Sequence, residues 1–202
     1  MPVGNGVQIT NCPSGSITFD TINITNYAAG AVIVDTVLAS FATDTITIGI
    51  NAGGAADAVF VNDVDNCLFG DIIIENADES GVSIASLPVG QTLGFGDITL
   101  NNPVDDYGLE VISCAGTLTF GSVVLQSGAV TGNPSVWING LTTDGSITFM
   151  STNAPNGIQV VAPAGTIDFG ATDCDAPILV DSPTAATITF AALDLDSATD
   201  GL

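Results

Sequence analysis

Carboxylates are the only charged side chains in this chain that could do chemistry. The 202 residues contain 22 Asp and Glu and no Lys, Arg or His, so the formal charge is −22. The chain therefore lacks an imidazole base, a Schiff-base amine and a guanidinium clamp for phosphate or carboxylate. It also lacks the positive charge with which proteins bind nucleic acids and anionic membrane surfaces. We expect neither partner, and we expect no membrane insertion because no apolar run reaches the length of a span.

Some of the carboxylates recur at matching places in successive segments. These are Asp71 and Asp97, which both follow Phe-Gly, and the loop residues Asp78, Glu79, Asp105 and Asp106. Stacked like charges repel unless a cation lies between them, and Ca²⁺ prefers carboxylate and carbonyl oxygens. The six residues are therefore a candidate Ca²⁺ site, although the chain has no Asp-x-Asp-x-Asp-Gly loop. The alternative is a solvated acidic edge without metal, and no other cofactor is expected.

Eight of the nine phenylalanines recur at intervals of 20 to 29 residues and define a repeat. They are Phe19, Phe41, Phe69, Phe95, Phe120, Phe149, Phe169 and Phe190. Most of them end an alternating triplet such as Ile147-Thr-Phe149, and a second pair such as Ile22-Asn-Ile24 often follows after a short corner. A longer loop then leads to a third pair, such as Val32-Ile-Val34. Alternation with a period of two predicts strands whose paired residues face one side.

Three short strands in each of about eight repeats predict an all-β chain that winds into stacked coils. Each coil can bury its apolar row only against its neighbours, so we expect one domain over residues 1–202. Residues 1–15 are the partial first coil, and residues 16–202 hold eight repeats of which the last is open. The eight phenylalanines form the expected core ladder, and eight coils at about 4.8 Å each stack to roughly 38 Å. A sandwich of short strands is the alternative, but Asn-Gly hairpin signals are scarce.

This order of strands resembles the right-handed parallel β-helix, the pectin-lyase-like β-solenoid of bacterial surface adhesins, phage tailspikes and polysaccharide lyases. The resemblance covers nearly the whole chain and includes no catalytic motif. Lyases and galacturonases of this fold generally use Arg, Lys or His, and this chain has none. We therefore expect no enzyme. The alternative is a polysaccharide-processing enzyme that relies on paired carboxylates, either Asp105 with Asp106 or Asp194 with Asp196.

Two outward rows of side chains are candidate binding surfaces. The middle residues of the third strands are unexpectedly apolar, which is typical of a contact face unless a loop of the same chain covers them. The candidate contact face consists of Ile33, Phe60, Trp137 and Leu179. The first strands carry Ser and Thr instead, as at Thr117 and Thr119, and such ladders resemble those of ice-binding proteins. Thr also suits any exposed strand position, so this row needs no ligand.

The four cysteines, Cys12, Cys67, Cys114 and Cys174, lie about two coils apart. Two coils separate Cα atoms by about 10 Å, which is beyond the roughly 7 Å limit for a disulfide. We therefore expect thiols packed in the core. A bond between Cys12 and Cys174 of two stacked chains is the alternative.

The first and last strands of the chain are in phase, and neither end shows a polar cap. Uncapped coils expose backbone groups that another strand can pair with. We therefore expect a structural or adhesive β-solenoid at the cell surface or outside the cell. It is either a filament subunit that stacks on itself head to tail or laterally, or a segment that packs on adjoining repeats of a larger surface protein. The alternatives are passive binding of Ca²⁺, ice or glycan. The absence of Lys and Arg removes every trypsin-type site, which suits a durable exterior component.

Overall fold

The computed structural model describes residues 5–51, 56–101, 106–126 and 133–196. This part of the chain forms 19 strands and no helix, and it winds into a single-domain β-solenoid of about 7 turns. With no helix in these ranges, none is present that could cross a membrane.

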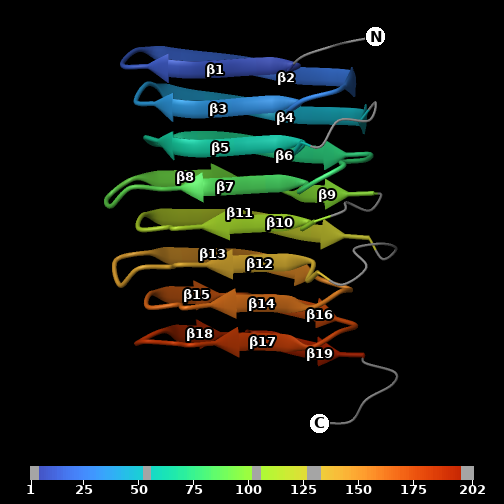
Figure 1. The fold of residues 1–202 in the computed structure, drawn as a ribbon, viewed down its shortest axis with the longest axis vertical. Coiled ribbons are helices and arrows are strands. Elements are labelled where there is room, and N and C mark those ends of the chain that lie inside the picture. Colours follow the sequence, from blue (N-terminus) through green and yellow to red (C-terminus); the bar gives the residue numbers. More distant parts are fainter. Residues whose placement is uncertain (1–4, 52–55, 102–105, 127–132, 197–202) are drawn as a thin grey trace.

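The strands form two sheets that face each other along the whole rod (Figure 1). Sheet 1 has eight strands, in the order β1 (Val7–Cys12), β3 (Val32–Val37), β5 (Val59–Val64), β7 (Val82–Ser86), β10 (Leu109–Ile112), β12 (Val136–Asn139), β14 (Ile158–Val161) and β17 (Ile178–Asp181). Sheet 2 has the path β2 (Ser16–Tyr27), β4 (Ser40–Asn51), β6 (Cys67–Ile74), β8 (Thr92–Phe95), β11 (Thr117–Leu125), β13 (Ser146–Asn153), β15 (Thr166–Asp168) and β18 (Thr187–Thr189). The same sheet also contains β9 (Ile98–Leu100), β16 (Ala171–Cys174) and β19 (Ala192–Leu195).

The coil is right-handed, and every strand pairing in it is parallel. In Figure 1 the near strands of sheet 1 run to the left, the far strands of sheet 2 run to the right, and the chain descends from N to C. Seen from the N-terminal end, the chain turns clockwise as it moves away from the viewer, so the coil is right-handed. Parallel crossover connections adopt the same hand. Each sheet thus holds eight levels of strand. They make about 7 turns rather than eight full coils because no strand of sheet 1 follows β19 in the described part.

The three strands expected in each coil are separate at only three of the eight levels. At the other five levels, one continuous strand of sheet 2 replaces the first two, as in β2 and β11. The corner remains as a change of side-chain parity, since Phe19 and Ile22 both face inward although two residues, instead of one, lie between them. A full break occurs at Gly170, whose φ of 54° is in the left-handed region, between β15 and β16.

The turn from sheet 1 to sheet 2 also repeats. The fourth residue after the first residue of a sheet 1 strand has positive φ at seven levels. These residues are Asn11, Thr36, Asp63, Ser113, Gly140, Ala162 and Ser182, with φ between 49° and 75°. Only one of them is glycine, so the other six hold a conformation that L-residues seldom adopt. The first level and the last level share this turn with the inner levels.

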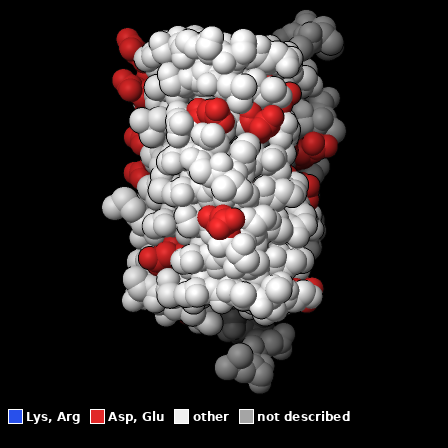
Figure 2. All heavy atoms as spheres, turned by 90° about the vertical axis from the view of Figure 1, so that its left-hand side faces the viewer, with Lys and Arg blue, Asp and Glu red and all other residues white. Residues whose placement is uncertain are grey.

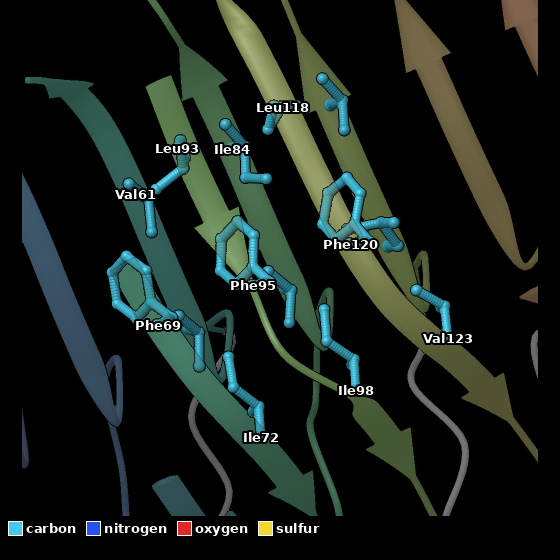
Figure 3. Packing of buried hydrophobic residues seen from close by; sticks show 14 of the residues in the cluster. Val61, Phe69, Ile72, Ile84, Leu93, Phe95, Ile98, Leu118, Phe120 and Val123 are labelled. Atoms are coloured by element: carbon cyan, nitrogen blue, oxygen red, sulfur yellow. The ribbon is translucent and has the colours of Figure 1, made fainter. Parts of the chain in front are cut away.

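Inward side chains from both sheets form one continuous core. In Figure 3 the rings of Phe69, Phe95 and Phe120 lie in a row across neighbouring strands, beside the aliphatic row of Ile72, Ile98 and Val123. From Phe69 to Phe190 successive ring centroids lie 4.7 to 5.1 Å apart with interplanar angles of 6° to 15°. Offset stacks of this kind add to the stabilisation from burial. The predicted ladder is confirmed over these levels.

Phe41 is out of register with the other rings of the ladder. Its backbone pairs with Ile17, and Thr43 occupies the position opposite Phe19 and Phe69. Because side chains two residues apart face the same way, Phe41 still enters the core, but its ring tilts by 51° to Phe19 and by 43° to Phe69. The prediction of one unbroken Phe column is wrong at this level.

Candidate functional surfaces

Asp71 and Asp97 have a structural role at the corner of sheet 2. The Oδ1 atom of Asp71 accepts the backbone N–H of Asp97 at 3.0 Å, and Oδ1 of Asp97 accepts that of Ser122 at 2.7 Å. A Cβ atom at Gly96 would lie 2.5 Å from Oδ1 of Asp71, and one at Gly121 would lie equally near Asp97. The Phe-Gly-Asp sequence is thus explained, because glycine makes room for the carboxylate of the level before it.

Among the described residues, the loop carboxylates are not gathered with Asp71 and Asp97 into one cluster. Asp78, Glu79 and Asp106 lie in loops that lead from sheet 2 to sheet 1, and Oδ1 of Asp106 accepts a hydrogen bond from Nδ2 of Asn133 at 3.1 Å. Asp105 lies outside the described residues. Within the ranges that the structure describes, no group of three or more His, Cys, Asp or Glu side chains is arranged to hold a metal ion.

Among the described carboxyl groups, Asp57 has the most strongly raised pKa, and the sequence patterns did not single it out. Burial raises its pKa to about 6, and the charges of Glu110, Glu79 and Asp106 act in the same direction. The N–H of Ser80 partly offsets this by donating to Asp57 Oδ1 at 3.1 Å. Asp57 and Ser80 both stand two residues before a strand of sheet 1, so aligning the loops on those strands would have brought them together.

Two other acids of this region also carry raised pKa values. Burial is the main cause at Glu110 and at Asp106, and at Glu110 the hydroxyl of Ser83 opposes it by donating to Oε2 at 2.7 Å. We call Asp57, Glu79, Asp106 and Glu110 the acidic edge. No base balances it, because the chain contains none. The side of the rod at which sheet 1 turns into sheet 2 also carries Asp and Glu (red) and no Lys or Arg (blue), as Figure 2 shows.

The candidate contact face forms one outward row along sheet 1. In register order this row is Gln8, Ile33, Phe60, Ser83, Glu110, Trp137, Gln159 and Leu179. Ile33, Phe60 and Trp137 are half-buried, and Leu179 is exposed. The ring of Tyr107, from the loop before β10, stacks on Trp137 with centroids 4.9 Å apart at 11°. A loop residue thus covers one member of this face, Trp137. The hydrogen-bonded polar pair Ser83–Glu110 lies between Phe60 and Trp137 and interrupts the apolar row.

The outward Ser and Thr residues of sheet 2 extend further than the Thr-x-Thr triplets indicated. One column has Ser16 and Ser40 at its N-terminal end, Asn66 at the level of β6, and then Thr92, Thr117, Ser146, Thr166 and Thr187. The neighbouring column is broken by Ala42, Leu68, Gly94 and Asp168. Hydroxyl groups of the first column bond one another across levels, as where Oγ of Ser146 donates to Oγ1 of Thr117 at 3.4 Å. The array is therefore partly a structural ladder.

Two shallow grooves accompany these surfaces. One of about 650 Å³ crosses sheet 2 beside Asn153, Asp173 and Asp194. The other, of about 390 Å³, lies beside Asn156, Gln159 and Leu179 on sheet 1. The first groove contains Asp194, which the sequence pattern paired with Asp196 as alternative catalytic carboxylates. The acidic residue that the strand register places beside Asp194 is Asp173.

All four cysteines are free thiols, as expected from their spacing. Cys67, Cys114 and Cys174 are buried, and burial raises the pKa of each to about 11. The thiols of Cys12, Cys67 and Cys114 each donate to a carbonyl two residues away in the chain. The three buried cysteines therefore serve as packing groups, since thiols with a raised pKa stay protonated and are poor nucleophiles.

The ends of the rod differ most from its interior. At the C-terminal end Val180, Leu193 and Leu195 are 43%, 45% and 52% exposed. Their neighbours one level inward, Val160, Thr172 and Cys174, are 0%, 4% and 1% exposed. At the N-terminal end Val7, Ile9, Ile17, Phe19 and Ile24 are only partly buried against the core. Both ends therefore present core side chains and unpaired strand edges within the described residues.

Comparisons with protein-family models, curated proteins and solved structures found no match to this chain. The class of protein is defined by the geometry alone. It is a right-handed parallel β-solenoid with a continuous apolar core.

Proposed function

We propose that this chain is a non-enzymatic, structural or adhesive β-solenoid of the cell surface or the extracellular space. Its ends are joints, continued either by further copies of the chain stacked head to tail or by adjoining repeats of a larger surface protein. The observation that carries the proposal is that the terminal levels are built like inner levels and leave their core side chains exposed.

Two properties of the chain support this function over catalysis and over binding of nucleic acid. Its 202 residues contain no Lys, Arg or His to serve as base, clamp or phosphate ligand. The same composition leaves no site for trypsin-type proteases. Two of the carboxylates considered for a Ca²⁺ site, Asp71 and Asp97, accept structural hydrogen bonds from backbone N–H groups, which favours solvated carboxylates over a bound cation.

The experiment that tests the joints measures association of the purified chain by sedimentation and electron microscopy over a range of concentrations. We expect rods that lengthen with concentration and with salt, since screening weakens the repulsion between chains of charge −22. The expected axial repeat is roughly 38 Å.

A matched pair of variants connects the association to the end of the rod. Leu195→Asp puts a charge on the exposed C-terminal end, and Leu68→Asp makes the same change at an exposed position within sheet 2. We expect Leu195→Asp to abolish association and Leu68→Asp to preserve it. Rods that stay monomeric at every concentration and salt would exclude head-to-tail stacking and leave adjoining repeats as the partner.

A further inference from the structure

The two ends of the rod present equivalent strands, each with one edge unpaired. Among the described strands, β1 pairs with β3 alone and β2 with β4 alone. At the other end β17, β18 and β19 pair only with β14, β15 and β16, respectively. Because all these pairings are parallel, the edge at one end has the direction that the edge at the other end requires. A contact between the two ends joins different surfaces and repeats without closing.

Extending the internal register across such a contact brings apolar side chains together in every inward column. In sheet 1, Ile178 and Val180 meet Val7 and Ile9 of a second copy. In sheet 2 the matches are Ile188 with Ile17, Phe190 with Phe19, Leu193 with Ile22 and Leu195 with Ile24. Phe190 ends a stack with about 5.0 Å between rings, and Phe19 of the second copy offers the next ring.

The corner of sheet 2 makes this register unique. Inward residues alternate up to Phe19, and the inward set then resumes at Ile22, three residues later. A shift of two residues would set Phe190 opposite Thr21, which faces outward. One strand alone tolerates a two-residue slip, but a strand with a change of parity does not.

One outward column adds a polar contact in the same register. Within the chain, Nδ2 of Asn153 donates to Oδ2 of Asp173 at 3.3 Å, and Asp173 is next to Asp194 on the following level. The residue that continues this column in a second copy is Asn23, which is exposed. Within the chain, the neighbour of Asp194 in this column is the carboxylate of Asp173. The amide of Asn23 in a second copy would place a hydrogen-bond donor on the opposite side of Asp194.

We propose that the C-terminal end of the rod binds the N-terminal end of a second copy in this register, so that β17 pairs with β1 and β18 and β19 pair with β2. The Phe stack then runs through the joint, and Asp194 accepts a hydrogen bond from Asn23 of the second copy. The inference rests on the proposed function, and it names the partner and the register of the same joint.

Exchanging the charge at one contact tests the register. Asn23→Asp sets two carboxylates opposite each other and should lower the association constant about tenfold, equal to about 1.4 kcal/mol. Adding Asp194→Asn restores an amide–carboxylate pair and should return the constant to within about threefold of the parent. Asn66→Asp adds the same charge at an exposed residue away from both ends and should change nothing. Sedimentation equilibrium in 0.5 M salt gives the constants, and circular dichroism of dilute samples checks the fold.

Disulfide trapping gives a second measurement that does not depend on charge. In a Cys12→Ser background, Thr18→Cys with Thr189→Cys sets thiols on adjacent levels of the joint, within the Cα range of about 4.4 to 6.8 Å for a disulfide. Ser16→Cys with Thr189→Cys is the control, because an offset of two residues exceeds that range. Under copper–phenanthroline and oxygen, which accepts the electrons from the two thiols, we expect covalent multimers from the first pair only.

The outcomes separate this inference from the proposed function. If the parent associates but Asp194→Asn fails to rescue Asn23→Asp, or both thiol pairs cross-link equally, the register is wrong and stacking stands. If the parent does not associate at any concentration or salt, both the register and head-to-tail stacking fail.

Discussion

The inner and the terminal levels of this solenoid have the same backbone but different burial. Val160 in β14 is inaccessible to solvent, whereas Val180, its partner in β17, is 43% exposed. The left-handed turn at Ala162 in the inner level recurs at Ser182 in the last level. Burial in this protein is therefore supplied by the neighbouring coil and not by the coil itself, as expected of a repeat architecture.

Truncating a ring at each kind of level gives the largest expected difference. Phe120→Ala removes a buried ring with neighbours 5.1 Å and 4.7 Å away, so we expect a loss of about 3 to 5 kcal/mol in the free energy of unfolding. Phe190→Ala removes a half-buried ring with one neighbour and should cost less than about 2 kcal/mol. Urea denaturation of dilute monomer measures both. Equal losses would show that the terminal level is as well packed as the inner ones.

The acidic edge predicts an unusual pH dependence. Because the pKa of Asp57 rises to about 6 on folding from 3.8, the folded state binds more protons between these values, and stability falls as the pH rises through this window. The raised pKa of Glu110 acts in the same direction. We expect the chain to be more stable at pH 5 than at pH 7.5 by about 1 kcal/mol, after allowing for solvent screening of the half-buried Asp57.

Asp57→Asn attributes this pH dependence to one inner loop. The amide oxygen can still accept the N–H of Ser80, so the variant should match the parent at pH 5 and exceed its stability at pH 7.5. Asp181→Asn makes the same exchange at an exposed residue of the last level, far from this loop, and controls for the loss of one charge. Thermal unfolding at the two pH values provides the measurement, and an unaltered profile in Asp57→Asn would contradict the assignment.

Thr152 and Thr172 test how strictly an inner level excludes polar groups. The Oγ1 atom of Thr152 is buried without a hydrogen-bond partner, and its neighbour in the column one level before is the apolar Val123. Thr152→Val should therefore stabilise the fold by about 1 kcal/mol. Thr172 lies one level further and donates to the carbonyl of Phe169 at 3.0 Å, so Thr172→Val should not stabilise. Calorimetry of the two variants decides between these roles.

The smallest expected effect concerns the left-handed turn. Ala162 has a φ of 49° and no side-chain group to compensate the strain, so Ala162→Gly should stabilise the fold by about 0.5 kcal/mol. Ser182→Gly at the terminal level should have less effect, because that coil frays most easily. A loss of stability in Ala162→Gly would mean that glycine's freedom in the unfolded chain outweighs the relief of strain.

The sequence was sufficient to predict the coil, the inward columns and the free thiols. Period-two triplets such as Ile147-Thr-Phe149 that recur in phase predict stacked strands with their paired residues facing the core. The same pattern predicted that the terminal strands lack a cap. Phe41 was misassigned because its ring still enters the core from an inward position two residues before that of the other rings. Side-chain identity alone does not distinguish these two registers.

The surfaces were less predictable than the core. Asp71 and Asp97 were matched correctly as a recurring pair, but their hydrogen bonds to the next level depend on backbone N–H groups that side-chain patterns do not show. Asp57 has no acidic counterpart in other repeats, so a search for recurrence could not find it. The contact face of Ile33, Phe60, Trp137 and Leu179 remains a prediction, in which Tyr107 covers one member.

The stacking of parallel strands along the rod has a mechanical consequence. Hydrogen bonds between levels point along the long axis, so a pull on the two ends loads them one level at a time instead of shearing many at once. We expect a rod under tension to unwind coil by coil from an end at low force. Each coil of 20 to 29 residues would release roughly 70 to 100 Å of chain, so the molecule would extend in steps, one coil at a time, under a sustained force.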